Sequence, residues 1–153
     1  MTTIASNRRA FYDYEIIEKF EAGMGLLGRE VKSLRSGRLN LAGGYVSIRP
    51  DGAWLENVNI ADWPQAAKTG VPYEPLRSRK LLLKKSELKR LIGQTAQKGL
   101  SLVPLECYFN KRGIAKIQIA LVKGKRQYDR KEAKKKKDLT REMRRDFAEK
   151  FKA

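Results

Sequence analysis

The chain has 153 residues, with 34 Lys and Arg against 17 Asp and Glu, a formal net charge of +17 and no histidine. A single cysteine excludes an intrachain disulfide, and together with the lack of histidine it excludes the usual zinc ligand sets. The lack of histidine also excludes a histidine-dependent catalytic triad. Because cations that neutralise phosphates release counterions, so large a positive charge predicts a polyanionic partner.

The first residues show no basic stretch followed by an apolar one, which is the pattern of a secretory signal. We therefore expect a cytoplasmic protein. Aromatic and β-branched residues across positions 11–23 predict a strand. A tight group of glycines ends this pattern.

A short helix is predicted next, because Leu27, Val31 and Leu34 recur at helical spacing. Gly37 is a suitable C-terminal stop. We expect the charged residues of this helix to point away from the core or to lie at its edge; they are Glu30, Lys32 and Arg35.

A β-hairpin is predicted where Asp51 and Gly52 separate the extended runs 45–49 and 53–60. Strand alternation favours a core position for Trp54. Residues 62–75 hold three prolines and few aliphatic residues, so they predict a surface loop, with Trp63 as its anchor.

Three leucines, at positions 81–83, lie between two basic clusters and predict a buried strand or turn. The helix that follows has Ser86 as its expected N-cap and Glu87 in its first turn. Gly99 is its expected end. Its expected apolar face consists of Leu88, Leu91, Ile92 and Thr95.

Residues 100–109 predict a strand that is out of phase around Pro104, which a bulge or an edge position would accommodate. Cys107 falls in the apolar pattern, so we expect an inert thiol in the core. A turn at 110–113 leads to a last strand at 117–121. Five or six strands with two or three helices predict a mainly β protein, a small antiparallel barrel with helices packed on it.

The composition changes near position 122, which divides the chain into a barrel domain, 1–122, and a basic C-terminal tail, 123–153. The tail has 14 Lys and Arg against 6 Asp and Glu, so it is expected to be disordered when free. An apolar residue recurs every four positions behind Asp138, which predicts a helix induced by a partner. These residues are Leu139, Met143, Phe147 and Phe151.

Two kinds of charged cluster are candidates for function. Basic residues beside glycines and aromatics are typical of an RNA-binding surface. They are Arg8, Arg9, Lys32, Arg35, Arg38, Arg77, Arg79, Lys80, Lys84 and Lys85. The carboxylates either face water from alternate strand positions or bind a metal for phosphodiester cleavage. They are Asp13, Glu15, Glu18 and Glu21.

Several segments resemble the SsrA-binding protein (small protein B) family, in order and over nearly the whole chain. They are Phe20-Glu21-Ala22-Gly23, the stretch 28–37 with Glu30-Val31-Lys32-Ser33-Leu34-Arg35, the stretch 75–83 with Arg79-Lys80-Leu81-Leu82-Leu83, and Gly124-Lys125 with Asp129. The resemblance implies a bacterial trans-translation factor with an oligonucleotide-binding-fold barrel. Such a factor delivers transfer-messenger RNA to stalled ribosomes.

By this resemblance, one barrel face grips the tRNA-like domain of the RNA, and the tail enters the decoding centre and the empty mRNA channel. The RNA-binding residues that the resemblance implies are Asn7, Glu21, Arg77, Lys80 and Leu82. The basic clusters add Arg8, Lys32, Arg35, Arg79 and Lys84 to the predicted RNA-binding residues. The implied ribosome-binding residues are Gly124, Lys125, Tyr128, Asp129, Arg130, Lys131, Lys134 and Lys135. Alanyl-tRNA synthetase and elongation factor Tu would be met only through the RNA. No cofactor, metal or membrane is expected.

Two other hypotheses remain open at this point. A ribosomal protein or a general RNA chaperone with the same barrel would also be strongly basic. A metal-dependent nuclease would use the carboxylates near Glu21.

Overall fold

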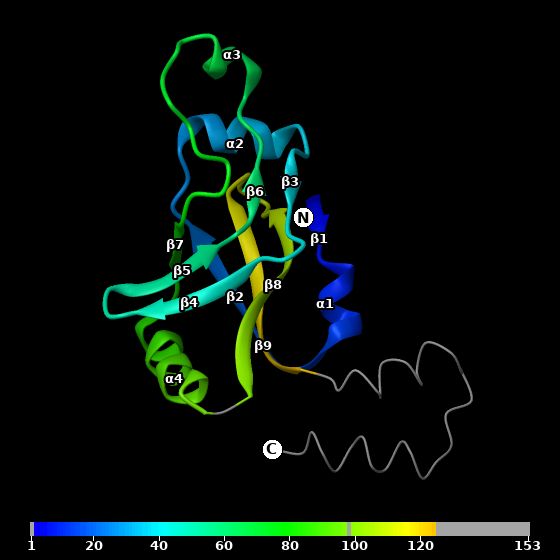
Figure 1. Ribbon diagram of the computed structural model, residues 1–153, viewed down its shortest axis with the longest axis vertical. Coiled ribbons are helices and arrows are strands. Elements are labelled where there is room, and N and C mark those ends of the chain that lie inside the picture. The colour runs from blue at the N-terminus through cyan, green and yellow to red at the C-terminus, as the bar shows by residue number, and fades with distance from the viewer. Residues whose placement is uncertain (1, 98, 125–153) are drawn as a thin grey trace, which may run out of the picture.

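A closed antiparallel sheet forms the centre of the computed structural model, which describes residues 2–97 and 99–124. The sheet runs β1-β8-β4-β5-β7-β2-β9, and β8 also pairs with β9. Six strands therefore close into a barrel, and β1 is added to β8 from outside (Figure 1). Its strands are β1 Thr2–Ser6, β2 Tyr14–Met24, β4 Tyr45–Arg49, β5 Gly52–Glu56, β7 Arg79–Leu82, β8 Leu100–Phe109 and β9 Ala115–Gly124. This confirms the predicted mainly β barrel.

The remaining elements cover the barrel. A two-stranded sheet pairs β3 with β6, so the described residues contain more strands than the five or six predicted. These elements are α1 Arg8–Asp13, α2 Gly28–Arg35, β3 Leu39–Asn40, β6 Asn59–Ile60, α3 Pro64–Ala67 and α4 Lys85–Thr95. None of the helices in the described part of the chain is both long and apolar enough to cross a membrane.

Two helices close the ends of the barrel, α2 at the top of Figure 1 and α4 at the bottom. Leu34 of α2 and Leu91 of α4 are buried in the same apolar cluster as the inward residues of the strands, such as Ile119. Cys107 is also fully buried there, as predicted. Burial raises the pKa of its thiol to about 12, which keeps the thiol protonated and unreactive.

The short helix α1 covers the outside of β8 and β9. Ala10 packs there in a second buried cluster with Val103, Leu105, Ala120 and Val122. The alternation of buried and partly exposed residues along β9 therefore ends after Ile119, because both faces of that part of the strand are covered.

The predicted strand at 11–23 is wrong in its first three residues, which belong to α1. Asn7 caps this helix, because its side-chain oxygen accepts a hydrogen bond from the Ala10 N–H at 3.3 Å. The cap outweighs the strand propensity of Phe11 and Tyr12. Strand β1, which was not predicted, pairs with the end of β8.

Helix α2 lies where it was predicted, but it is rotated about its axis. Glu30, Ser33 and Leu34 are buried, whereas Leu27 is 45% exposed. The predicted outward position of Glu30 is therefore wrong, and its ion pairs, described below, give the reason. Gly37 ends the helix with a positive φ of 71°, as predicted.

Helix α4 begins before Ser86, so the predicted N-cap is wrong. The Lys84 N–H donates to the Glu87 carboxylate at 3.4 Å, and this contact helps to fix the first turn. Leu91 is buried as predicted, but Ile92 is 50% exposed. The apolar face of this helix is narrower than its sequence suggests.

The predicted hairpin is confirmed, with Arg49 paired to Gly52 across the turn. Its second strand ends at Glu56, because Asn57 adopts a positive φ of 56°. The predicted core position of Trp54 is wrong. Its side chain is half-buried on the outer face, where the indole N–H donates to Asp51 at 3.0 Å.

The predicted features of the last two strands are confirmed. The register of β8 against β9 shifts just after Pro104, which places a bulge there. The turn at 110–113 is closed by the Asn110 side chain, which accepts hydrogen bonds from the Arg112 and Ile114 N–H groups.

The last strand runs beyond the predicted domain boundary at 122. Lys123 and Gly124 still belong to β9, and Gly124 pairs with Tyr14 of β2. Gly124 is therefore part of the barrel sheet, and the predicted tail segment begins after it. The other predicted tail residues lie outside the described residues.

We predict opposite effects of Gly→Ala at two positions. A Cβ atom at Gly44 would lie 2.5 Å from Val58 Cγ2 and 3.0 Å from the Leu41 carbonyl oxygen, so Gly44→Ala should lower the free energy of unfolding by about 1–3 kcal/mol. Gly93, inside α4, has no atom within 4 Å of such a Cβ, so Gly93→Ala should raise it by about 0.5–1 kcal/mol. Urea denaturation measures both, and equal effects would contradict the packing described at Gly44.

Candidate nucleic-acid interface

Four barrel strands place neighbouring residues side by side on their outer face. The register sets Leu82 of β7 opposite Gly23 of β2, Gly23 opposite Lys116 of β9, and Lys116 opposite Tyr108 of β8. Successive strand residues point to opposite faces, and Leu81 is buried in the core, so Leu82 points outward. We call Leu82, Gly23, Lys116 and Tyr108 the outer row.

Glu21 lies beside the outer row, two residues before Gly23 on the same strand. The Tyr108 hydroxyl reaches across β9 and donates a hydrogen bond to the Glu21 carboxylate. Burial raises the pKa of Tyr108, and the hydrogen bond to Glu21 raises it further, so the hydroxyl keeps its proton. The exposed carboxylate is thus a hydrogen-bond acceptor held in one orientation.

Gly23 allows close packing in the middle of the outer row. A Cβ atom there would lie 3.3 Å from Leu82 Cβ and 3.7 Å from Lys116 Nζ. The absent side chain therefore lets Leu82 and Lys116 pack closely over Gly23, which is buried.

Leu82 is 60% exposed, whereas Leu81 is 3% exposed. Lys80, which is also exposed, lies two residues before Leu82 and therefore on the same face of β7. An apolar side chain among cations offers both a surface for a nucleotide base and neutralisation of phosphate.

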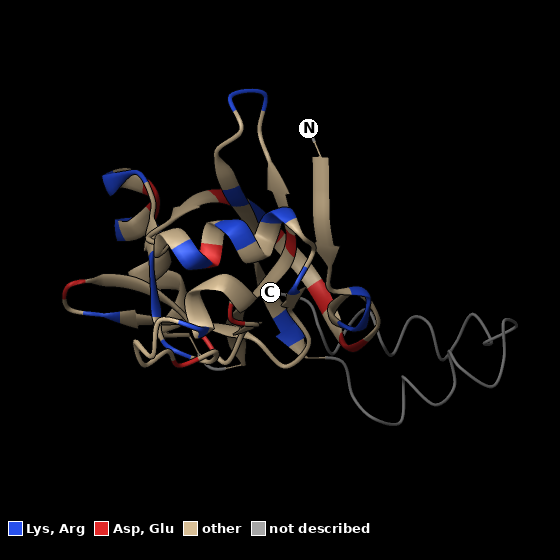
Figure 2. Cartoon of the chain, turned by 90° about the horizontal axis from the view of Figure 1, so that it is seen from above, with Lys and Arg blue, Asp and Glu red and all other residues tan. Residues whose placement is uncertain are grey.

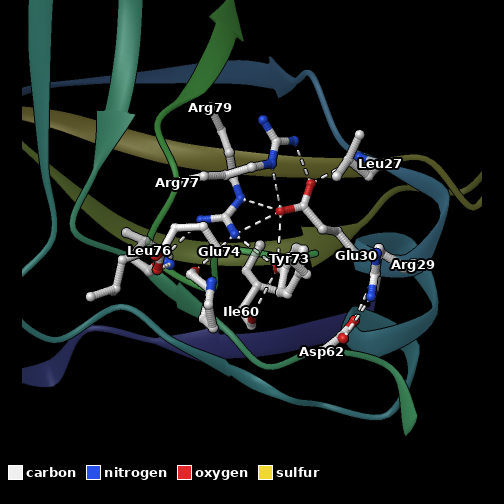
Figure 3. A network of polar contacts seen from close by, with 12 residues as sticks. Leu27, Arg29, Glu30, Ile60, Asp62, Tyr73, Glu74, Leu76, Arg77 and Arg79 are labelled. Atoms are coloured by element: carbon white, nitrogen blue, oxygen red, sulfur yellow. Dashed lines mark hydrogen bonds and ion pairs between the residues drawn. The ribbon is translucent and has the colours of Figure 1, made fainter. Parts of the chain in front are cut away.

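A buried ion-pair network holds β7 against α2 (Figure 3). The Glu30 carboxylate is fully buried and accepts hydrogen bonds from Arg77 Nε at 3.0 Å, Arg79 Nε at 2.7 Å and the Leu27 N–H at 2.8 Å. Burial by itself raises the pKa of Glu30, but the hydrogen bonds from Arg77, Leu27 and Arg79 outweigh it and lower that pKa. Glu30 is therefore ionised in the folded protein.

Arg79 is the most deeply buried cation of this network, with no exposed surface. Besides Glu30, its guanidinium donates to the carbonyl oxygens of Val58 at 2.8 Å and Pro75 at 2.9 Å. It thus joins β7 to the segment before β6 and to the end of the long loop. Each of these buried polar groups is satisfied by the contact.

Tyr73 connects the same network to the loop at 62–75. Its hydroxyl donates to the Ile60 carbonyl at 2.7 Å, and burial raises its pKa to about 12. The Arg29 guanidinium lies 4.9 Å from its ring centroid and makes two hydrogen bonds to Asp62, at 2.8 and 2.7 Å. The loop is therefore fixed to α2 at both of its ends.

Two predicted RNA-binding residues are buried, which corrects the sequence-based prediction. Arg79 cannot contact RNA directly, because its surface is fully covered. Asn7 is 6% exposed, and its side-chain N–H donates to the Pro104 carbonyl at 2.9 Å while its oxygen caps α1. Both residues hold the neighbouring backbone in place by these hydrogen bonds.

The other predicted residues are accessible but are not gathered on one face. Glu21, Lys80 and Leu82 lie on the outer face of the barrel. Arg8 is on α1, and Lys32 and Arg35 are on α2, where Lys32 covers the Trp63 ring at 4.0 Å. Lys and Arg are distributed around the described barrel (Figure 2).

No sequence pattern indicated a functional role for Tyr108, Lys116 or Gln118, which lie on the outer face. Gln118 lies between Glu21 and Glu106 in the strand register. Since β8 and β9 are about 90 residues from β2 in sequence, only the pairing of the strands brings these residues together.

Three of the four carboxylates in this segment have separate partners. Glu18 pairs with Arg90 at 2.7 Å and Asp13 with Arg9 at 3.3 Å, while Glu21 accepts from Tyr108. Across residues 2–97 and 99–124, no group of three acidic or cysteine side chains is arranged to hold a metal ion. The described residues thus give the nuclease hypothesis no support.

Known proteins of one family match this chain over nearly its whole length. The family described as "SmpB protein" matches residues 4–149. An SsrA-binding protein of Sulfurihydrogenibium sp. is 50% identical over 97% of this chain and 96% of its own length. An SsrA-binding protein of Thermus thermophilus is 45% identical over 94% of this chain and 98% of its own length.

A solved structure is also similar in fold. It is described as "tmRNA-SmpB: a journey to the center of the bacterial ribosome", and its matching chain is 47% identical with a TM-score of 0.68. The match covers 84% of this chain and 92% of that one.

We predict that Glu30→Gln lowers the free energy of unfolding by about 3–5 kcal/mol, because it leaves buried guanidinium groups without their counter-charge. Glu18→Gln is the matched control: it removes the surface pair with Arg90 and should cost less than about 1 kcal/mol. Urea denaturation at pH 7 measures both, and a cost for Glu30→Gln as small as the control's would contradict the network's role.

The stability difference between the wild type and Glu30→Gln should depend on pH. The pKa of Glu30 is lower in the folded than in the unfolded state, so its contribution is present above the unfolded pKa and disappears as the pH falls through the folded one. The stability difference between the wild type and Glu30→Gln should therefore shrink below about pH 4. A difference that stays constant to pH 2 would contradict this linkage.

Proposed function

This chain belongs to the SmpB family of SsrA-binding proteins, and on that premise we propose that it binds transfer-messenger RNA and brings it to stalled ribosomes in trans-translation. It acts as an adaptor between two RNA assemblies, not as an enzyme. This role explains the high positive charge without requiring a catalytic centre.

The observation that best supports an RNA-binding barrel is the exposed Leu82, which lies among Lys80, Lys116 and the oriented Glu21 carboxylate. A surface that contacted only phosphates would have no use for an exposed leucine or for a carboxylate, which repels phosphate. Both groups are useful for contacts to bases and sugars, so this face is the proposed site for the tRNA-like domain.

The basic tail is the proposed ribosome-binding part. Its residues from Lys125 onward lie outside the described residues, so their role rests on the family and on the sequence. The tail would occupy the decoding centre and the mRNA channel, which places the protein's action in the cytoplasm. Alanyl-tRNA synthetase and elongation factor Tu would act on the same RNA without direct contact.

A general RNA chaperone with the same barrel is the alternative to exclude. Competition binding separates the two: unlabelled tRNA-like domain should displace labelled transfer-messenger RNA far better than a structured RNA of equal length. Equal displacement by both competitors at physiological salt would favour the chaperone.

We predict that Leu82→Asn weakens binding to the tRNA-like domain about tenfold, because it removes roughly 1–2 kcal/mol of apolar contact. Its stability should change little, since Leu82 is 60% exposed. Ile92→Asn on α4 is the matched control, because Ile92 is 50% exposed and lies off the proposed face. A titration in which both variants bind like the wild type would remove Leu82 from the interface.

Deleting residues 125–153 should separate RNA capture from ribosome rescue. The truncation keeps β9 whole, yet it removes 13 Lys and Arg against 6 Asp and Glu. We predict nearly unchanged specific binding to transfer-messenger RNA at physiological salt, together with loss of peptidyl transfer to that RNA on stalled ribosomes. Loss of specific RNA binding by the truncated protein would refute this division of labour.

A further inference from the structure

We propose that the end of the chain, residues 138–151, docks as a helix in a groove on the outside of its own barrel. The groove lies beside the point where the last strand, β9, ends. In the docked state the apolar side of this helix is covered before any partner is met, and a partner must displace the barrel in order to bind it. Docking concerns the free protein, so it does not depend on the proposed function.

Two adjoining cavities form the groove. The first, of about 260 Å³, lies between α1 and the residues just before β4. The second, of about 440 Å³, lies between β4 and β8 and reaches the end of α4. Tyr14, Tyr45 and Val103 line both cavities, so the two form one continuous surface, which we call the side groove.

The side groove exists because β4 and β8 separate. Within the described part of the chain these strands pair at one position, Val46 with Leu102, whereas β8 pairs with β9 at nine positions. The gap opens the apolar interior to the surface, and Val46, Ile48 and Leu102 line the second cavity. An apolar cavity of about 150 Å³ is large enough to bind benzene, so each of the two cavities has room for one large apolar side chain.

The end of the chain carries the side chains that such a groove requires. Its apolar residues recur every four positions, so they lie along one side of a helix, the pattern by which amphipathic helices bind apolar grooves. They are Leu139, Met143, Phe147 and Phe151. Residues 138–153 hold five Lys and Arg against four Asp and Glu, whereas residues 125–137 hold eight against two. The basic half therefore suits a polyanion, but the nearly neutral end calls for an apolar partner.

The pairing of β9 puts this segment within reach of the side groove. Gly124, the last residue of β9, pairs with Tyr14, which lines both cavities. Residues 125–138 then connect Gly124 to Leu139, and a chain of this length spans at most about 50 Å. Because the segment is tethered to the groove, its effective concentration there is of roughly millimolar order. A dissociation constant in that range is enough to populate the docked state, and it is weak enough for a partner to displace the segment.

A nitroxide label at the end of the full-length chain tests the docking. Ala153→Cys provides the attachment site, and the natural Cys107 does not compete for the label because it is fully buried with a raised pKa. The label should broaden the amide NMR signals of Tyr45, Ser101 and Val103. It should not broaden those of α2, which closes the other end of the barrel from α4 (Figure 1). Lack of this selective broadening would overturn the proposal.

Four variants of the labelled protein separate docking from chance proximity. Phe147→Asp and Tyr45→Ala should each abolish the broadening, because one removes an anchor of the segment and the other a wall of the groove. Ala148→Asp adds the same charge off the apolar side of the helix and should keep the broadening. Phe11→Ala should also keep it, because Phe11 is 48% exposed, against 50% for Tyr45, but lines neither cavity. Broadening that Phe147→Asp leaves unchanged, or that Phe11→Ala alone removes, would contradict docking in the side groove.

Salt and mixing identify the kind of contact and its occupant. Apolar contacts are not screened, so the broadening should persist in about 1 M salt, where the Debye length is about 3 Å. Its loss there would indicate a contact between charges and would refute apolar docking. The broadening should be absent when nitroxide-labelled protein is mixed with unlabelled, isotope-enriched protein, because the proposed contact is within one chain. Its presence in the mixture would assign the groove to a second copy instead.

Hydrogen exchange measures the docked fraction independently. The amides of residues 141–151 should exchange about three- to tenfold more slowly in the wild type than in Tyr45→Ala, because exchange requires the undocked state. Phe11→Ala should exchange like the wild type. Equal rates in the wild type and Tyr45→Ala would overturn the proposal, whatever the outcome of the RNA-binding measurements.

Discussion

The Glu30 carboxylate, buried without solvent contact, is the constraint on which the rest of the structure depends. A buried charge is costly unless it is paired and fully hydrogen-bonded, so the chain around it has little freedom. Arg79 must approach from β7, Arg77 from the segment just before β7, and the Leu27 N–H from the start of α2. This requirement fixes the rotation of α2 at one end of the barrel, and through Tyr73 it also fixes the loop that leads into β7.

One consequence is that cationic residues divide into two groups that look alike in sequence. Arg79 stabilises the fold and is hidden, whereas Lys80, its neighbour, is exposed on the outer face. A high net charge indicates the class of partner, but it does not identify the residues that touch that partner. The outer row shows the converse: three of its four residues, a leucine, a glycine and a tyrosine, are not cations, yet they lie on the face proposed for RNA.

Local patterns predicted those parts of the fold that are determined locally. The hairpin at Asp51 and Gly52, the bulge after Pro104 and the stop at Gly37 follow from turn chemistry and proline geometry. The rotation of α2 could not be predicted from its own residues, because the partners of Glu30 lie 47 and 49 residues away. The outer row needs the register of four strands, which no single segment contains.

The pairing of β9 has a mechanical consequence for whatever the end of the chain binds. β9 lies between β2 and β8 along nearly its whole length, from the pair of Gly23 with Lys116 to the pair of Tyr14 with Gly124. Tension applied beyond Gly124 would run along the strand axis and would load two hydrogen-bond ladders in shear. Because the bonds of such ladders lie across the strands, they would share the load instead of opening one at a time. The barrel is thus built as a firm anchorage for a pulled terminus, and three of the four strands that carry the outer row belong to this anchorage.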